Sequence, residues 1–354
     1  MMRFDEFVDN MELTIKSLFF SKNILAQVEI CEIKKSTDQY VGLAVKLPGE
    51  RIAPVYNLSA AYEDYLKGRD VKDILEDAMH VILDTAPNYD VEKLLDYEES
   101  KKKFFIKVCN AEKRADYLKG VPHTLVDDLA ITYHIMLSNK AGEIASVCIN
   151  NRLLEHYGVS LEKLHKDATE NAAKILPPKV TDFKDIPAIA EMEEVLRGEE
   201  WNENEIPCPF DMVVTNELGI AGAATLFYPD TLDQLAEKYG GSFYVLPSST
   251  EEVLTVCDCG VDEIPEMNSM VREVNSRCVE ENQQLGSEVY HYDADDRIFE
   301  RGTKYAERKQ QKIQELESGR EVTFVLRVMK AKAQKMNKKT KNNEQHKGND
   351  NLSL

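Results

Sequence analysis

The stretch NELGIAGAATLFYPDTLDQLAEKYGGSFYVLPSS, residues 216–249, decides the fold class. Small residues follow an apolar run here, and a helical pattern then begins at Asp230 and ends at Gly240. A further apolar run, SFYVLPS, comes directly after the helix. Strand, tight turn, helix and strand in close succession are typical of sheets packed against helices. The stretch therefore predicts a mixed α/β domain.

The glycines in this stretch do not complete a phosphate-binding motif. A dinucleotide fingerprint needs G-x-G-x-x-G, and a P-loop needs a lysine after its last glycine. Gly219 and Gly222 are spaced G-x-x-G, and no lysine follows them. We expect these small residues to bring the turn close against the sheet. Gly240 is typical of a helix C-cap.

Working outward, the chain is predicted to be α+β. An N-terminal helix-sheet layer domain covers residues 1–89, with the element order α-β-β-β-α-α. The larger mixed α/β domain covers 90–300, and a helical extension, with coiled-coil character, covers 301–336. Residues 337–354 lack apolar periodicity and are predicted to be a disordered basic tail.

Charge and cysteine content narrow the classes of partner and compartment. The net charge is −19, although from residue 327 onward eight basic residues stand against two acidic ones. An acidic body repels nucleic acid and anionic membranes. No signal peptide and no apolar run long enough for a spanning helix are present, so we expect no membrane contact. Seven scattered cysteines favour reduced thiols in a cytoplasmic protein.

Three segments carry a resemblance to a known family: GVSLEKLHKDATEN (158–171), GIAGAATLFYPDTLDQLAEKYGGSFYVLPSSTEEVL (219–254) and VYHYDADDRIFE (289–300). Together they resemble domain of unknown function 5688, an uncharacterised family of gut clostridia that is often encoded among mobile-element genes. The central part is also similar to a second uncharacterised family, from bacilli. The resemblance implies a common fold and a bacterial cytosol. It brings no catalytic residues with it.

Candidate catalytic residues are found where predicted strand ends and turns converge, near 216–225 and 247–259. They are Asn216, Ser248 and Asp258. No complete catalytic motif accompanies them, so whether the chain is an enzyme stays open at this point. If it is one, we expect a hydrolase with an unrecognised site.

Metal and cofactor binding have little support in the sequence. Cys257 and Cys259 form a C-x-C pair without the second pair that a zinc site needs, and they are the only metal candidates. The acidic segment beginning at Asp293 lacks the glycine and the final acid of a calcium-binding loop. We interpret that segment as a solvated turn between a strand and a helix. The sequence predicts no cofactor and no metal.

The first hypothesis for function is a non-catalytic protein-interaction or accessory protein. The family resemblance also allows it to be an accessory protein of a mobile element. The alternative is the enzyme described above. A third hypothesis is nucleic-acid contact through spaced basic side chains of the tail, by counterion release. These side chains are Lys332, Lys335, Lys338, Lys339 and Lys341.

Overall fold

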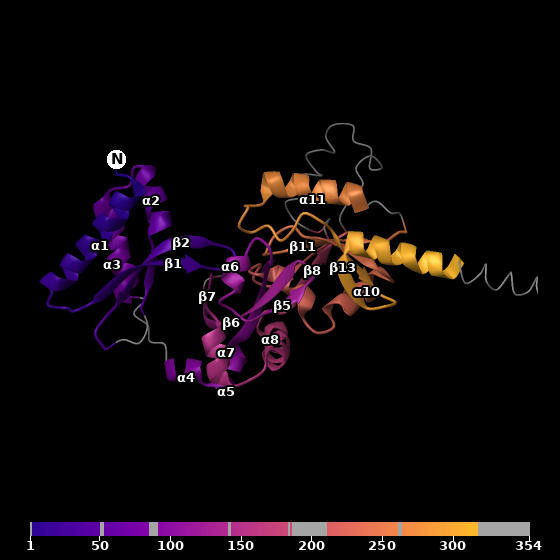
Figure 1. The fold of residues 1–354 in the computed structure, drawn as a ribbon, viewed down its shortest axis with the longest axis horizontal. Coiled ribbons are helices and arrows are strands. Elements are labelled where there is room, and N and C mark those ends of the chain that lie inside the picture. Colours follow the sequence, from indigo (N-terminus) through magenta and orange to yellow (C-terminus); the bar gives the residue numbers. More distant parts are fainter. Residues whose placement is uncertain are drawn as a thin grey trace, which may run out of the picture. The chain divides into compact units, whose positions relative to one another are not determined.

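The chain has an α+β fold, with helices and antiparallel sheets (Figure 1). The computed structural model describes residues 2–49, 53–84, 91–140, 143–182, 185, 211–260 and 264–317. Contacts divide the chain into two compact units, Met1–Phe299 and Glu300–Leu354. The predicted fold class is confirmed, whereas the predicted boundaries at residues 89 and 300 stay predictions.

The first part of the chain forms a helix layer on a small sheet. The elements, in order, are α1 (Phe4–Ser21), β1 (Gln27–Lys34), β2 (Gln39–Lys46), β3 (Val55–Asn57), α2 (Leu58–Leu66) and α3 (Val71–Asp84). The three strands pair antiparallel in the order β1-β2-β3. The predicted order α-β-β-β-α-α is therefore correct.

Helix α1 is amphipathic, and its inner face anchors this layer. Phe7, Met11, Ile15 and Phe19 recur every fourth residue and are buried. This spacing places all four on one side of the helix. They pack in one cluster with sheet residues such as Leu43 and Val45 and with α3 residues such as Ile74.

Polar side chains at the starts of the next two helices accept backbone hydrogen bonds. The cap of α2 is Asn57, whose side chain accepts a hydrogen bond from the Ala60 amide at 3.0 Å. The Ser59 hydroxyl, in the first turn of α2, accepts one from the Val41 amide at 3.0 Å. Asp70 directly precedes α3 and accepts from the Lys72 amide at 2.7 Å.

The next part of the chain begins with short helical segments and a second sheet. Its elements are α4 (Val91–Leu95), α5 (Tyr97–Ser100), η1 (Lys101–Lys103), β4 (Phe104–Asn110), α6 (Ala115–Leu118), β5 (His123–Val126), β6 (Leu129–Lys140), β7 (Glu143–Cys148), α7 (Asn151–Tyr157) and α8 (Leu161–Ile175). The long strand β6 pairs with β4 on one side, and with β5 and β7 on the other. The Ser160 side chain caps α8 by accepting a hydrogen bond from the Lys163 amide.

The third sheet contains the stretch that opened the sequence analysis. Its elements are β8 (Pro178–Asp182), β9 (Met212–Asn216), η3 (Gly222–Phe227), α10 (Thr231–Tyr239), β10 (Phe243–Leu246), β11 (Val253–Cys257), α11 (Ile264–Cys278), β12 (Tyr290–Asp293) and β13 (Ile298–Arg301). The strand order is β13-β12-β10-β11-β9-β8. A large cluster of buried side chains joins one face of this sheet to the second sheet.

One local prediction in this region was wrong. The acidic segment that begins at Asp293 lies in the turn between strands β12 and β13 and not between a strand and a helix, and the Asp293 side chain accepts from the Asp295 and Asp296 amides at 3.1 Å each. The helix predicted to begin at Asp230 is observed as α10, with Asp230 at its N-cap position in a left-handed backbone and without a side-chain cap hydrogen bond. His134, on β6, is 5% exposed.

The second compact unit contains a helix that begins at residue 302 and continues to residue 317 within the described part. From residue 310 onward every described side chain of this helix is exposed. Near its start, the Arg308 guanidinium donates to the Glu300 carboxylate at 2.6 Å. The helical extension is thus observed over these residues. The end of the predicted extension and the predicted basic tail lie outside the described residues.

Candidate functional site

The small-residue turn between β9 and η3 lies tightly against the sheet. Gly219 has φ +65° and Ala221 has φ +53°, both in the left-handed region. A Cβ placed on Gly222 would collide with the Thr215 side chain and the Glu251 carbonyl oxygen, and it would lie 2.9 Å from the Thr215 Cα. Only glycine fits such an approach. The close packing predicted for this turn is therefore observed.

A carboxylate of the protein itself engages this turn. Glu251, in the loop between β10 and β11, accepts a hydrogen bond from the Ala221 amide at 2.5 Å. Its second oxygen accepts from the Thr250 hydroxyl at 3.1 Å, and its main-chain carbonyl accepts from Thr215 at 2.7 Å. Backbone amides exposed by a tight turn attract anions. At Ala221 the anion is the Glu251 side chain.

Asn216 shapes the same turn. Its side chain is 1% exposed, donates to the Ile220 carbonyl at 2.7 Å, and accepts from the Leu218 amide at 3.0 Å. An amide that makes both of these local bonds fixes the chain reversal at the end of β9. In this arrangement Asn216 holds the backbone of the turn.

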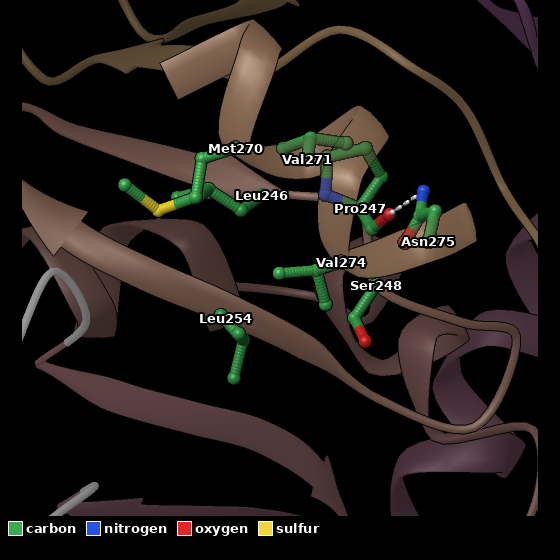
Figure 2. A pocket seen from close by; sticks show the side chains of 8 residues that line it. All are labelled: Leu246, Pro247, Ser248, Leu254, Met270, Val271, Val274 and Asn275. Carbon is green, nitrogen blue, oxygen red and sulfur yellow. Dashed lines mark hydrogen bonds between the residues drawn. The ribbon is translucent and has the colours of Figure 1, made fainter. Parts of the chain in front are cut away.

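Ser248 lies at the edge of a small apolar hollow under α11, shown in Figure 2. The hollow has a volume of about 10 Å³, room for one water molecule at most. Its lining comes from the β10–β11 hairpin and from one side of α11: Leu246, Pro247, Ser248, Leu254, Met270, Val271, Val274 and Asn275. The Asn275 side chain turns to the hairpin and donates to the Pro247 carbonyl at 3.3 Å.

Asp258 forms a buried pair with His291, which no sequence motif indicated. Its carboxylate lies 2.9 Å from His291 Nε2, and the side chains are 10% and 0% exposed respectively. His291 is directly opposite Tyr244 on the neighbouring strand, with ring centroids 4.8 Å apart. A carboxylate that holds an imidazole in one orientation is a common element of acid–base sites.

The three candidate catalytic residues do not converge. Asn216 ends β9 and Ser248 follows β10, so both lie at the end of the sheet where the β10–β11 hairpin turns. Asp258 lies at the opposite end of the hairpin, where its amide donates to the Ser242 carbonyl at 3.1 Å. Six residues separate Ser242 from Ser248, which is about 20 Å along a strand. A Ser–His–Asp arrangement of Ser248 with the buried pair is therefore excluded by geometry.

The candidate metal residues lie beside this buried pair. Cys257 is half-buried and Cys259 is exposed. Burial, followed by a hydrogen bond with the Cys259 thiol, raises the pKa of Cys257. A raised thiol pKa disfavours the thiolate, which is the form that binds metals. Among the described residues no group of three or more His, Cys, Asp or Glu is arranged to hold a metal ion.

His291 and Glu251 were missed for one reason: each is recognisable only through its partner. Asp258 and His291 are 33 residues apart, and Glu251 and Ala221 are 30 apart. No spacing rule connects such pairs. The strand pairing of β10 with β11 and β12 brings the first pair together. His291 does lie in the segment VYHYDADDRIFE, which carried part of the family resemblance.

The fold and this arrangement define an α+β protein without a complete catalytic motif among its described residues. Residues 4–294 match a family described as a family of unknown function (DUF5688), and the chain belongs to this family. The predicted resemblance to it is confirmed. No curated protein and no solved structure matches the chain. None of the described helices has the length and apolar character that crossing a membrane requires.

Proposed function

We propose that this protein is a non-catalytic accessory protein of the cytoplasm, which binds another protein through the outer face of α1. The outer face includes Leu13, Ser17 and Phe20 beside the exposed acids Glu6 and Asp9, and Leu25 follows the helix after a short turn. Leu13 is 64% exposed, Phe20 is 77% exposed and Leu25 is 79% exposed. Large apolar side chains grouped at the surface mark interaction sites. This exposed group is the observation that supports the proposal.

The geometry of this face suits a helical partner. Leu13 and Phe20 are seven residues apart, two turns of the helix, so they project from the same side about 10 Å apart. Two apolar side chains at this spacing match the anchors of helix-against-helix recognition. The partner that we propose is therefore an amphipathic helix of another protein, which lays its apolar stripe along α1.

The inner face of α1 explains why the outer residues are free to bind. Phe7, Met11, Ile15 and Phe19 already fill the core beneath the helix. Leu13 and Phe20 lie on the other side, so their substitution leaves that packing unchanged. Among the other exposed apolar side chains of the described residues, Leu66 and Leu125 occur singly on their elements, which is ordinary for a protein surface, whereas Ile313 and Leu316 lie together on the helix at 302–317.

The test replaces the apolar outer face and measures binding. Full burial of one such side chain contributes about 2 kcal/mol, so Leu13→Ser together with Phe20→Ser weakens partner binding by roughly a hundredfold or more. The matched control is Ser17→Ala, which lies between them and removes no apolar surface. The measurement is quantitative co-purification at native abundance. Equal recovery of the partner with the double variant and with the control would contradict the proposal.

A second candidate function is an enzyme whose acid–base group is the Asp258–His291 pair. The 2.9 Å contact between these buried side chains is the observation that favours it. Asp258→Asn keeps the shape of the side chain and removes the charge that orients the imidazole. If Asp258→Asn abolishes the function of the protein in cells while its folding and its partner binding are unchanged, the enzyme is favoured over the accessory protein.

A further inference from the structure

Strand β1 is a long open edge of the three-stranded sheet. Among the described residues it pairs with β2 alone, over all eight of its positions and without a bulge. The edge strands of the third sheet, β8 and β13, have five and four residues. Proteins ordinarily keep edge strands short or interrupt them with proline or a bulge, because unpaired backbone groups pair readily with another chain. Strand β1 has none of these three features, so its edge is open to pairing.

The pairing with β2 shows which backbone groups of β1 face this edge. The Val41 amide, on β2, donates away from β1 to the Ser59 hydroxyl at 3.0 Å. In an antiparallel pair, opposite residues turn their N–H and C=O groups either toward each other or both outward, and the two cases alternate along the strand. Glu32 lies opposite Val41, so Glu32, Ile30 and Lys34 turn these groups to the open edge. Ile30 is half-buried and the other two are exposed, and among the described residues their outward groups have no hydrogen-bond partner.

The edge is self-complementary in one register. A twofold antiparallel pair of β1 strands is centred on one residue that faces its own copy. With Cys31 at the centre, Ile30 lies opposite Glu32 of the second copy, and the same pair repeats across the axis, so the outward groups of both residues are satisfied. With Glu32 at the centre, two carboxylates face each other, which is unfavourable. With Ile30 or Ile33 at the centre, one of the outward-facing residues lies beyond the end of the other strand.

The charges of the strand fit the same register. Lys35 directly follows β1, and its Nζ lies 5.0 Å from the centre of the Tyr40 ring, which is opposite Ile33. Lys35 is therefore on the same face of the sheet as Ile33 and Glu29. With Cys31 at the centre, Glu29 lies opposite Ile33 of the second copy and diagonally across from its Lys35, within reach of a long side chain. Two such pairs of opposite charge form, and no like charges lie directly opposite each other.

We propose that the edge of β1 is an interface between two copies of this chain, in which the two β1 strands pair antiparallel about a twofold axis at Cys31. The two three-stranded sheets then form one continuous sheet, and main-chain hydrogen bonds supply the affinity. The pairing uses the backbone of β1 and no residue of the outer face of α1. It therefore stands independently of the binding function proposed for that face.

Cys31 tests the register, because it is the residue that faces itself. Its Cα lies about 4.5 Å from that of its copy, which is close enough for a disulfide. Copper phenanthroline oxidises the full-length protein, and peptide mass spectrometry locates the bonds. We expect dimers linked through Cys31 in preference to dimers linked through the more exposed Cys259 and Cys278. Cys31→Ser combined with Glu29→Cys abolishes the cross-link at this strand, because the two copies of residue 29 lie about 13 Å apart.

Dimers linked through Cys259 or Cys278 in place of Cys31, or equal yields from positions 29 and 31, overturn the proposal.

Sedimentation velocity tests the interface without cross-linking. The unmodified protein should sediment as a dimer, and a monomer at every concentration overturns the proposal without depending on the folding of any variant. Glu32→Pro removes an outward N–H group that the fold itself does not use, and we expect it to abolish the dimer. The matched variant Glu32→Ala keeps this N–H group and the dimer. Equal dimerisation of the two variants also overturns the pairing of β1 with its copy.

Discussion

The Glu251 carboxylate accepts a hydrogen bond from the Ala221 amide at 2.5 Å, and this contact explains the small-residue turn. Ala221 is 5% exposed and has a left-handed backbone, so its amide has little access to water. The acidic side chain thus occupies the position in which a phosphate would be expected at a glycine-rich turn. The turn packs two strands and a loop together.

Removal of the Glu251 side chain destabilises the fold. Glu251→Ala leaves a buried amide without its acceptor, which costs about 1–3 kcal/mol. Glu251→Gln retains an oxygen acceptor and loses less. Urea denaturation measures the free energy of unfolding of both variants. The control is Glu252→Ala, at the exposed neighbouring position. If the alanine variants at 251 and 252 unfold at the same urea concentration, the carboxylate is not a structural ligand of the turn.

Addition of one methyl group to Gly222 disrupts the packing of the turn against the sheet. A Cβ at this position collides with the Thr215 side chain, on strand β9, and with the main-chain carbonyl of Glu251. Overpacking of this kind costs about 1–3 kcal/mol. Gly241→Ala is the matched control, because nothing lies within 4 Å of its added Cβ. Thermal unfolding should show a lower midpoint for Gly222→Ala alone, and equal midpoints would argue against close packing.

Helix α11 is attached to the third sheet through a buried amide. The Asn268 side-chain oxygen accepts from the Val289 amide at 2.7 Å, and Asn268 is 6% exposed. Asn268→Ala removes the acceptor and should lower the free energy of unfolding by about 1–3 kcal/mol. Ser269→Ala, at the exposed next position, should change it by about 0.5 kcal/mol or less. Hydrogen exchange at Val289 provides a local readout, and unchanged protection there would contradict this role.

Stability should fall as the pH falls through the range in which free histidine titrates. Burial lowers the pKa of His134 far below 6.5 in the folded state, and burial lowers that of His165 as well. The unfolded chain therefore binds more protons, and stability is complete above about pH 6.5 and is lost progressively below it. Urea midpoints at pH 7.5 and 5.5 test this expectation.

The His134→Gln variant isolates one contribution to this pH dependence. Because His165 still titrates, the variant should lose only part of the difference between the two midpoints. A variant with the full difference would show that His134 is not the group responsible. The control is His80→Gln, because His80 is an exposed residue of α3.

The sequence predicted elements whose own residues determine them. The helix that ends at Gly240 and the strand after it are observed as α10 and β10, because apolar periodicity and a C-cap glycine are local features. The turn at Asp293 was misplaced because the short strand β13 is held by its neighbour in the sheet rather than by its own pattern.

The candidate site was harder to predict because it depends on pairing across the sheet. Asp258 was selected from its position after a strand, and its partner His291 became visible only when β12 was paired with β10. Ser248 and Asn216 were grouped with Asp258 because they too follow strands. The antiparallel hairpin instead places Asp258 at its other end.

The most direct test of partner binding by the outer face of α1 places a photo-crosslinking amino acid at Ser17, between Leu13 and Phe20, in cells at native abundance. We expect one cross-linked partner protein, which disappears when Leu13 and Phe20 are both changed to serine and which is absent when the crosslinker is at the exposed position Lys179 on β8. A cross-link only to a second copy of this chain, or the same products from both positions, would contradict it.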